Sequence, residues 1–336
     1  MKRAEWLQAV WYGERQPGVG LMGLSLLFRG LAFARRRLWR AGLLRQTRLP
    51  VPVVVVGNIS VGGTGKTPMV QALWQRLTAA GLRVGVVSRG VGGVQQLRQV
   101  EPSDAPDEVG DEPLLLARRG VRPLWVGRDR PAAARALLAR QPVDLIVSDD
   151  GLQHYALARQ FEIIMMDGER GLGNGRLLPA GPLREPETRL ATADAVVCTG
   201  KAVAGLDCRV MCLDPGALMP VASGGKRVPE LCGQRVHAVA GIGHPRRFFS
   251  MLEDMGMDVI AHPFADHHPF RAEDLDFGDE LPVVMTEKDA VKCRAFARPH
   301  WYYLPVEARF DPAFEAWLLA RLRQLQTDPV KEVFCG

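Results

Sequence analysis

Short runs of apolar, mostly β-branched residues alternate along the chain with segments in which apolar residues recur at helical spacing. Helical patterns follow two of these runs, at Pro68–Leu77 and Pro131–Arg140. The runs themselves are Val53–Val56, Leu82–Ser88, Val121–Val126, Val143–Val147 and Phe161–Met166. Continuous apolar strands separated by helices predict a mostly parallel sheet covered by helices on both faces.

The second half of the chain restarts this alternation after residues 200–229, which combine mixed character with several turn signals. Its expected elements are the strands Arg235–Ala240, Pro282–Thr286 and Trp301–Leu304 and the amphipathic helix Ala313–Leu325. A chain of 336 residues is long enough for about two domains. We therefore expect a larger domain at residues 49–215 and a smaller C-terminal α/β lobe at residues 230–330.

Residues 1–48 have a different pattern, in which aromatic and apolar residues precede a cluster of arginines. The uncharged run Gly18–Phe28 is shorter than the ~20 residues of a membrane span. Arg29 interrupts the run and no small-residue cleavage site follows, unlike a signal peptide. The pattern favours basic amphipathic helices lying on an anionic membrane surface. A pair of helices packed on their own domain is the alternative.

The distribution of charge indicates an anionic partner. The net charge is +6, and no acidic residue lies between Glu14 and Glu101. Such a basic region suits a nucleotide, a nucleic acid or a membrane surface. No nucleic-acid-binding motif accompanies the charges, so we expect no nucleic-acid partner. The cysteines are scattered without a C-x-x-C pair, which indicates neither a zinc site nor a disulfide framework.

The stretch Val51–Met69, VPVVVVGNISVGGTGKTPM, predicts a strand, a phosphate-binding loop and a helix. In such a loop, backbone N–H groups point at phosphate oxygens, Lys66 reaches the β- and γ-phosphates and Thr67 binds Mg²⁺. The expected ATP-binding residues are Ser60, Val61, Gly62, Gly63, Thr64, Gly65, Lys66 and Thr67. Ser60 stands where the usual spacing has a glycine. A tight strand-to-helix turn would explain the glycines but not the Lys-Thr pair.

A second candidate site follows the run Val143–Val147, which ends in Ser148-Asp149-Asp150-Gly151. A strand that ends in aspartate downstream of a phosphate loop is typical of a magnesium-associated carboxylate. An Asp-Asp-Gly turn is the alternative. We expect Thr67, Asp149 and Asp150 to form a Mg²⁺ site, and the pattern does not decide which aspartate contacts the metal directly.

Several motifs stand in a fixed order along the chain. They are GNISVGGTGKTP, SRG, VGDEP, SDDGLQH, LPAGPLREP, AGIG-P-RF, DHH and TEKDAVK. Together they resemble the tetraacyldisaccharide 4′-kinase family, from about Trp6 to the last helix. The resemblance implies a peripheral enzyme at the cytoplasmic face of the bacterial inner membrane. It would transfer the γ-phosphate of ATP, with Mg²⁺, to the 4′-hydroxyl of a tetraacyldisaccharide 1-phosphate lipid, forming lipid IVA in lipid A biosynthesis.

The resemblance also implies roles for individual residues. Asp111 of VGDEP and His267 of DHH correspond to the catalytic pair of the family, although Asp111 also suits a helix N-cap and His268 adjoins His267. The family carries a tyrosine where this chain has Val91, which removes one expected sugar contact. The residues expected near the substrate are Arg130, His154, Asn174, Arg184 and Glu185.

The resulting fold prediction is an α/β protein with a P-loop NTPase-like, mostly parallel sheet flanked by helices, a smaller C-terminal α/β lobe and N-terminal membrane-associated helices. The main alternative is a membrane-associated P-loop ATPase of the partitioning or division-site type. Those proteins carry a lysine just before the two glycines, where this chain has Val61. A nucleotide-gated scaffold is a third possibility, but it would need neither Asp111 nor His267.

Overall fold

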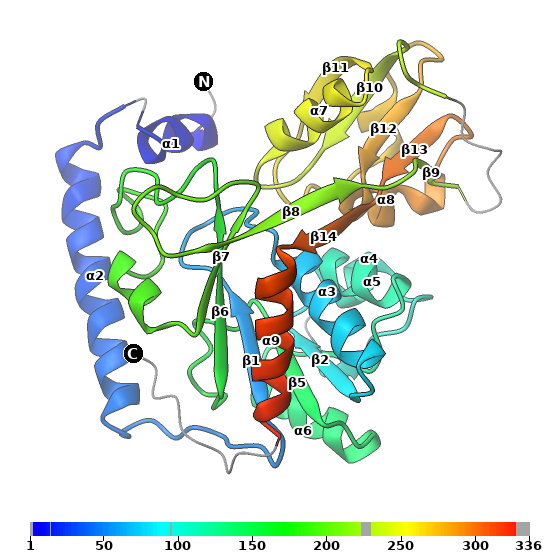
Figure 1. Ribbon diagram of the computed structural model, residues 1–336. Coiled ribbons are helices and arrows are strands. Elements are labelled where there is room, and N and C mark those ends of the chain that lie inside the picture. The colour runs from blue at the N-terminus through cyan, green and yellow to red at the C-terminus, as the bar shows by residue number, and fades with distance from the viewer. Residues whose placement is uncertain (1–2, 14, 95, 223–229, 327–336) are drawn as a thin grey trace.

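Two sheets organise the computed structural model, which describes residues 3–13, 15–94, 96–222 and 230–326. A nine-stranded sheet has the order β14-β8-β7-β6-β1-β5-β2-β4-β3, and a five-stranded sheet has the order β11-β10-β12-β13-β9. Figure 1 shows the smaller sheet and its helices above one end of the larger lobe. These two lobes confirm the expected α/β class.

The larger sheet is parallel throughout except at β3–β4 and β8–β14, which pair antiparallel. Its strands are β1 Val53–Gly57, β2 Val84–Ser88, β3 Arg98–Gln99, β4 Leu124–Val126, β5 Leu145–Asp149, β6 Phe161–Asp167, β7 Ala195–Thr199, β8 Arg209–Pro215 and β14 Val306–Phe310. Its helices are α3 Lys66–Ala79, α4 Pro106–Val109, α5 Asp111–Arg118, α6 Arg130–Arg140, η1 Glu187–Thr192 and α9 Pro312–Gln324. Ligands bind at the carboxyl ends of such strands, where the strand order reverses. Strand β1, between β5 and β6, lies at this position.

Alternate residues of β1 enter different hydrophobic cores on the two faces of the sheet. Val54 and Val56 pack in the core that α3, α5 and α9 cover. Val53 and Val55 pack in the opposite core with α6. Because successive strand side chains point to opposite faces, both faces must be apolar when both are covered. This explains the unbroken valine run that precedes the phosphate loop.

The smaller lobe is built on parallel strands with one short antiparallel edge, β9. Its elements are β9 Met219–Pro220, β10 Arg235–Ala240, α7 Pro245–Asp254, β11 Asp258–Pro263, η2 Ala272–Leu275, β12 Val283–Thr286, α8 Glu287–Cys293, η3 Arg294–Phe296 and β13 Trp301–Leu304. Two hydrophobic clusters cover the two faces of this sheet. The lobe therefore has a core of its own.

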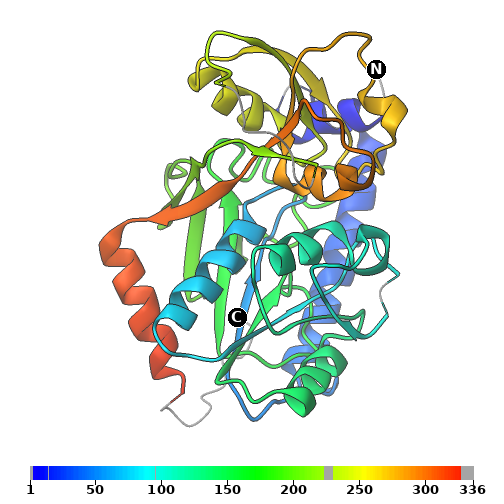
Figure 2. The same cartoon turned by 90° about the vertical axis from the view of Figure 1, so that its right-hand side faces the viewer.

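The expected span of the smaller lobe, residues 230–330, is wrong at its C-terminal end. Strand β14 leaves the smaller lobe and pairs with β8 at the edge of the larger sheet. Helix α9 then packs Phe314, Leu318 and Leu322 into the core of the larger lobe. Figure 2 shows β14 running down from the smaller lobe and α9 lying against the larger one. The two lobes are therefore joined through adjacent strands.

The N-terminal segment forms two helices, α1 Arg3–Trp11 and α2 Val19–Arg40. Helix α2 lies along the flank of the larger lobe (Figure 1) and buries no side chain completely. Among the described residues, no helix combines the length and the apolar character that a bilayer span requires.

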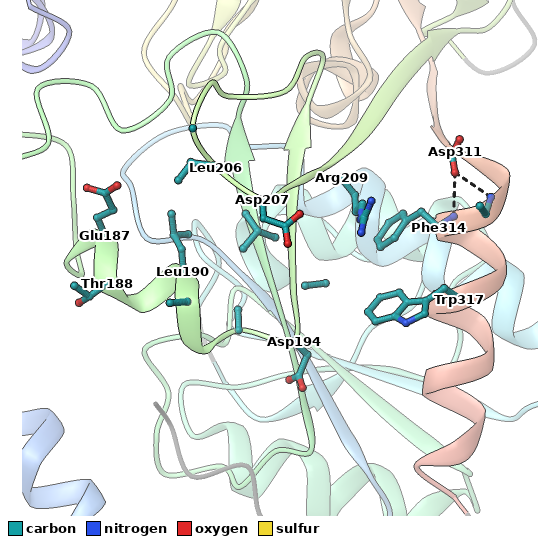
Figure 3. A pocket seen from close by; sticks show the side chains of 16 residues that line it. Glu187, Thr188, Leu190, Asp194, Leu206, Asp207, Arg209, Asp311, Phe314 and Trp317 are labelled. Carbon is teal, nitrogen blue, oxygen red and sulfur yellow. Dashed lines mark hydrogen bonds between the residues drawn. The ribbon is translucent and has the colours of Figure 1, made fainter.

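A hollow of about 900 Å³ lies between η1, the loop after β7 and helix α9. Phe314 and Trp317 project from α9 toward Arg209 on its wall, and Asp311 accepts hydrogen bonds from the first turn of α9 (Figure 3). No residue of the predicted phosphate loop lines this hollow. It is therefore separate from the nucleotide site.

Candidate active site

The phosphate loop connects β1 to α3, as the sequence predicts. Gly65 precedes α3 with a left-handed φ of 81°, and Lys66 and Thr67 form the first turn of that helix. Gly62 has a φ of 114°, a conformation that side chains disfavour. Gly62, like Gly65, therefore supplies a backbone conformation that a residue with a side chain would adopt only under strain.

Ser60 lies in extended pairing instead of in the tight part of the loop. It forms an antiparallel bridge with Leu183, and the Val61 N–H donates a hydrogen bond of 2.8 Å to the carbonyl of Pro182. An extended position has no need of a glycine. This pairing explains why serine is tolerated where the usual spacing has glycine.

A cleft of about 630 Å³ separates the two lobes at the phosphate loop. One wall is the loop itself, from Val61 to Thr67. The smaller lobe contributes the segments Ile242–His244 and Asp266–His267, and the end of α1 contributes Trp11 and Tyr12. The cleft therefore has the position expected for a nucleotide and an acceptor that meet between the lobes.

The carboxylate of Asp150 lies between two basic side chains at the phosphate loop. Lys66 Nζ lies 3.4 Å from Asp150 Oδ1, and Arg184 Nη1 lies 3.6 Å from Asp150 Oδ2. Burial would raise the pKa of Asp150, but the charges of Lys66 and Arg184 outweigh it and lower that pKa. Asp150 is therefore ionised and holds both cations beside the loop.

Asp149 has the opposite electrostatic environment. Its side chain is buried, and Ser88 Oγ donates a hydrogen bond of 3.0 Å to Asp149 Oδ2. Burial, together with the nearby carboxylates of Glu112 and Asp150, raises the pKa of Asp149 to about 7. A neighbouring divalent cation would favour its ionised form.

Carboxylate oxygens of these two aspartates meet the requirements of a magnesium site. Asp149 Oδ1 and Asp150 Oδ1 are both buried and receive no hydrogen bond from the described residues. Thr67 and Asp150 both line the cleft, and Asp149 precedes Asp150 at the end of β5. Mg²⁺ prefers oxygen ligands, so Thr67, Asp149 and Asp150 fit this ion. We keep the assignment of the direct ligand open between Asp149 and Asp150.

Asp111 of the larger lobe and His267 of the smaller lobe are in direct contact; His267 lines the cleft, whereas Asp111 is not among the lining residues. Asp111 is the first residue of α5 and is buried, and His267 Nδ1 lies 3.0 Å from Asp111 Oδ2. The hydrogen bond to Asp111 raises the pKa of His267. The helix cap is Gly110, whereas Asp111 Oδ1 accepts the Glu112 N–H at 2.9 Å. His268 instead contacts Asp274 of its own lobe at 3.1 Å.

Glu112 and Lys288 complete this junction, although neither was predicted as a site residue. Lys288 Nζ lies 2.8 Å from Glu112 Oε1 and 3.0 Å from Asp266 Oδ1, and its pKa is raised despite burial because Glu112 and Asp111 attract its charge. Burial would raise the pKa of Glu112, but Lys288 and Lys66 bring it down to about 2. Glu112 belongs to the motif VGDEP and Lys288 to the motif TEKDAVK, and this membership was the signal from which a role could have been predicted.

Arg184 lines the cleft, but Arg130, one of the residues expected near the substrate, does not. The Arg130 side chain is fully buried, and its Nη2 donates a hydrogen bond of 2.7 Å to the carbonyl of Asp149. Burial lowers the pKa of Arg130 to about 10, with Asp149 acting against that effect. The expectation of substrate contact at Arg130 is therefore wrong, and the residue instead holds the backbone of Asp149.

Three further residues expected near the substrate make contacts within the larger lobe and do not line the cleft. Glu185 accepts hydrogen bonds from Gln153 and Tyr155, each at 2.8 Å. Asn174 donates hydrogen bonds of 3.0 Å to the Val10 carbonyl and 2.8 Å to the Ala180 carbonyl, which fastens α1 to the lobe. In this structure these two side chains therefore have internal partners away from the cleft.

His154 is the third of these residues, and it lies among arginines. Burial, reinforced by the charges of Arg130 and Arg89, lowers the pKa of His154 to about 4. Val91, which replaces the expected tyrosine, does line the cleft and is 39% exposed. The position is therefore open to the cleft even without the aromatic ring.

A phosphate loop, a pair of carboxylates beside it and an Asp-His pair facing it define a P-loop phosphotransferase. The family model described as "Tetraacyldisaccharide-1-P 4'-kinase" matches residues 18–323. The chain therefore belongs to the tetraacyldisaccharide 4′-kinase family. This membership does not favour the alternative of a partitioning-type ATPase.

Individual relatives agree with the family match. The tetraacyldisaccharide 4'-kinase of Pseudomonas putida (strain GB-1) is 49% identical over 333 residues, covering 98% of this chain and 100% of the relative. The kinase of Alkalilimnicola ehrlichii is 54% identical over 314 residues, covering 91% and 93%. The crystal structure of the "apo" form LpxK from Aquifex aeolicus in complex with ATP superimposes with a TM-score of 0.72. Its sequence is 28% identical, and the match covers 90% of this chain and 98% of that one.

Proposed function

We propose that the protein transfers the γ-phosphate of ATP to the 4′-hydroxyl of a tetraacyldisaccharide 1-phosphate lipid, the product being lipid IVA. The observation that carries the proposal is the contact between Asp111 and His267, because His267 lines the same cleft as the phosphate loop. Family membership supplies the acceptor. The ATP complex of the Aquifex aeolicus relative supports the nucleotide.

In this proposal Asp111 is the base for the attacking hydroxyl. A carboxylate next to a reacting hydroxyl accepts its proton as the new phosphorus–oxygen bond forms. His267 orients this carboxylate through Nδ1 and, with Lys288, balances its charge. Lys66 and Arg184 lie where positive charge would stabilise the phosphoryl oxygens. Mg²⁺ held by Thr67, Asp149 and Asp150 would add to this neutralisation.

We further propose that the protein works on the surface of a membrane, at the cytoplasmic face of the bacterial inner membrane. The acceptor lipid resides in a bilayer, so the enzyme has to approach it there. Helix α2 supports this idea because apolar side chains on it remain exposed, among them Leu24, Leu27 and Leu31. Arginines at 35–37 and at Arg40 flank them and suit anionic head groups.

The acceptor is tested by incubating the full-length protein with labelled ATP, Mg²⁺ and the disaccharide 1-phosphate lipid in detergent. We expect labelled lipid product, and we expect Asp111→Asn to lower turnover by ~10²–10⁴-fold, the usual effect of losing a general base. Asp107→Asn is the matched control, because Asp107 is an exposed carboxylate in the short helix just before Asp111. Asp107→Asn should leave turnover unchanged.

Binding of a non-hydrolysable ATP analogue separates chemistry from folding in the same variants. We expect Asp111→Asn to bind the analogue normally, whereas Lys66→Gln should bind it weakly because it loses the phosphate contact. Unchanged turnover in Asp111→Asn would refute the base assignment. Failure of the wild-type protein to label the lipid would refute the proposed acceptor.

A further inference from the structure

The two lobes also meet at a second place, where strand β6 of the larger lobe ends. Asp167 ends β6 in the larger lobe and is buried. His244 Nδ1 lies 2.9 Å from Asp167 Oδ2, and Arg247 Nη2 lies 2.8 Å from Asp167 Oδ1. His244 and Arg247 belong to the smaller lobe, so one carboxylate holds two of its side chains.

Backbone contacts extend this junction onto the phosphate loop. Arg170 Nη1 donates a hydrogen bond of 2.5 Å to the carbonyl of Gly243. Gly243 lies so close to the loop that a Cβ built on it would overlap the backbone of Gly62 and Gly63. The smaller lobe therefore contacts the part of the loop whose N–H groups would face phosphate oxygens.

The charges at this junction are balanced by the protein itself. Burial would raise the pKa of Asp167, but the hydrogen bond from His244 and the charge of Arg247 bring it to about 2. Glu169, half exposed, lies 3.3 Å from His244 Nε2. Asp167, Glu169 and His244 are close enough to share a cation, but Arg247 already provides the counter-charge to Asp167. The arrangement suits a latch between lobes better than a metal site.

We propose that Asp167 is a positioning residue that holds the smaller lobe against the phosphate loop through His244 and Arg247. The idea rests on the proposed kinase function. The Asp111–His267 contact is one junction between the lobes, and Asp167 forms a separate one through His244 and Arg247. The Asp167 junction keeps Gly243 packed on the loop, so that the loop has its working shape when ATP is bound.

The test measures steady-state kinetics of full-length variants with ATP and the lipid. We expect Asp167→Asn and Arg247→Gln each to lower kcat by ~10–100-fold, with the KM for lipid unchanged, as loss of positioning commonly does. The kcat of the double variant should be no lower than that of the more impaired single variant, because both changes break the same contact between the lobes. Arg247→Lys should recover part of kcat. Additive losses or an unchanged kcat in the single variants would overturn the proposal.

An exposed ion pair within the smaller lobe, Arg235 with Asp258 at 2.6 Å, is the matched control. Arg235→Gln and Asp258→Asn should leave kcat unchanged. Melting temperature, measured in parallel, identifies any variant that simply fails to fold. If the latch variants lost kcat only in proportion to lost folded protein, the positioning role would be refuted.

A second readout needs no lipid and separates this inference from the proposed acceptor. Hydrogen exchange is followed in the peptide that spans residues 58–66, with the non-hydrolysable ATP analogue bound. We expect faster exchange in Asp167→Asn than in wild type or in Asp258→Asn, because the loop loses its cover. Equal exchange rates would overturn the latch even if lipid phosphorylation succeeds. Faster exchange with no lipid labelling in the wild type would refute only the acceptor.

Discussion

Asp150 and His267 adopt positive φ values, 46° and 59°, the only non-glycine residues in the described ranges that do so. Both line the cleft, and both carry assigned chemistry. Such conformations cost of order 1–3 kcal/mol for a non-glycine residue and persist only where neighbours enforce them. Lys66 and Arg184 hold Asp150, and Asp111 holds His267. The strained backbone therefore occurs at two of the residues that the proposed reaction uses.

The Asp111–His267 contact should make stability depend on pH. Because the folded-state pKa of His267 is raised above 6.5, its stabilisation is complete below pH 6.5 and is lost as pH rises through the higher value. Comparing wild type with His267→Asn, which also tolerates positive φ, we expect a difference in unfolding free energy that is ~1 kcal/mol larger at pH 5.5 than at pH 9. Chemical denaturation at both pH values measures it.

His300→Asn serves as the control for that titration, because the His300 ring lies 3.8 Å from an exposed carboxylate, that of Glu280, and not beside a buried one like Asp111. Its effect on stability should be small at both pH values. A His267→Asn penalty that grows toward pH 9 would contradict the assigned direction of the pKa shift.

Two substitutions in the phosphate loop should affect kcat/KM to very different extents. Gly62→Ala forces a side chain into a φ of 114° and should lower kcat/KM by ~10–100-fold, the equivalent of 1–3 kcal/mol of strain. Ser60→Gly should change kcat/KM by less than about twofold, because residue 60 is held in extended pairing with Leu183. The kinase assay compares both variants with wild type. A strong loss in Ser60→Gly alone would contradict this account of the loop.

At the residue scale, the local pattern predicted the phosphate loop and the aspartate pair because each follows a buried strand, whereas the Asp111–His267 pair came from the family resemblance alone. Neither source assigned a role to Glu112 or Lys288, whose pairing joins lobes far apart in sequence. The resemblance also misplaced Arg130. A buried arginine and an exposed one look alike in sequence, and only the packing reveals that its guanidinium faces the back of Asp149.

Helix α2 presents two faces of different character. Its inner stripe touches the larger lobe, where Ser25 Oγ donates a hydrogen bond of 2.8 Å to the Leu177 carbonyl and Arg35 reaches the Gln153 carbonyl at 3.2 Å. Its outer face leaves Leu27 and Leu31 more than 60% exposed. An apolar face this open is typical of an interaction surface. The inner stripe agrees with the interpretation of helices packed on their own domain, and the membrane-surface interpretation stays a prediction for the outer face.

The outer face predicts binding to anionic vesicles. Replacing Leu27 and Leu31 together by Ser should weaken association by ~10-fold, because two partly inserted leucines lose their apolar contact. Raising the ionic strength should weaken the remaining binding, since arginines contribute the electrostatic part. Vesicle flotation measures both effects. Val94→Ser is the matched control, because Val94 is 63% exposed in a loop of the larger lobe. Equal flotation of the Leu27/Leu31 variant and wild type would refute the membrane-facing role.

The strands that the sequence predicted best are those buried on both faces. The runs Val53–Val56 and Phe161–Met166 match β1 and β6 to within one residue. Strands β8 and β14 gave no comparable signal, because β14 is the edge strand, β8 lies next to it, and both are only partly buried, as in Val306–Phe310. A short edge strand is fixed by the partner it finds, and this partner is almost a hundred residues away in sequence.

At the scale of the whole molecule, the C-terminal segment supports the helix that carries the phosphate loop. Arg76 of α3 lies 2.7 Å from Glu315 of α9 and donates a hydrogen bond of 3.0 Å to the Ala308 carbonyl of β14. The guanidinium of Arg76 also lies over the ring of Phe310. Local patterns predicted α9 as a helix but assigned it to the wrong lobe, because lobe membership is decided by these distant contacts.

This arrangement predicts that a destabilising substitution in α9 also weakens nucleotide binding. Leu318 is buried in the core of the larger lobe, so Leu318→Ala should destabilise the protein by ~2–5 kcal/mol through lost burial and the cavity left behind. Near the lowered melting temperature, the variant should also lose affinity for the ATP analogue, because α3 and α9 share this core. Ala320→Ser, an exposed change on the same helix, should alter neither property. If α9 instead belonged energetically to the smaller lobe, Leu318→Ala would loosen residues 230–304 in hydrogen exchange and leave α3 protected. We expect the reverse, with α3 and β14 exchanging faster while the core of the smaller lobe keeps its protection.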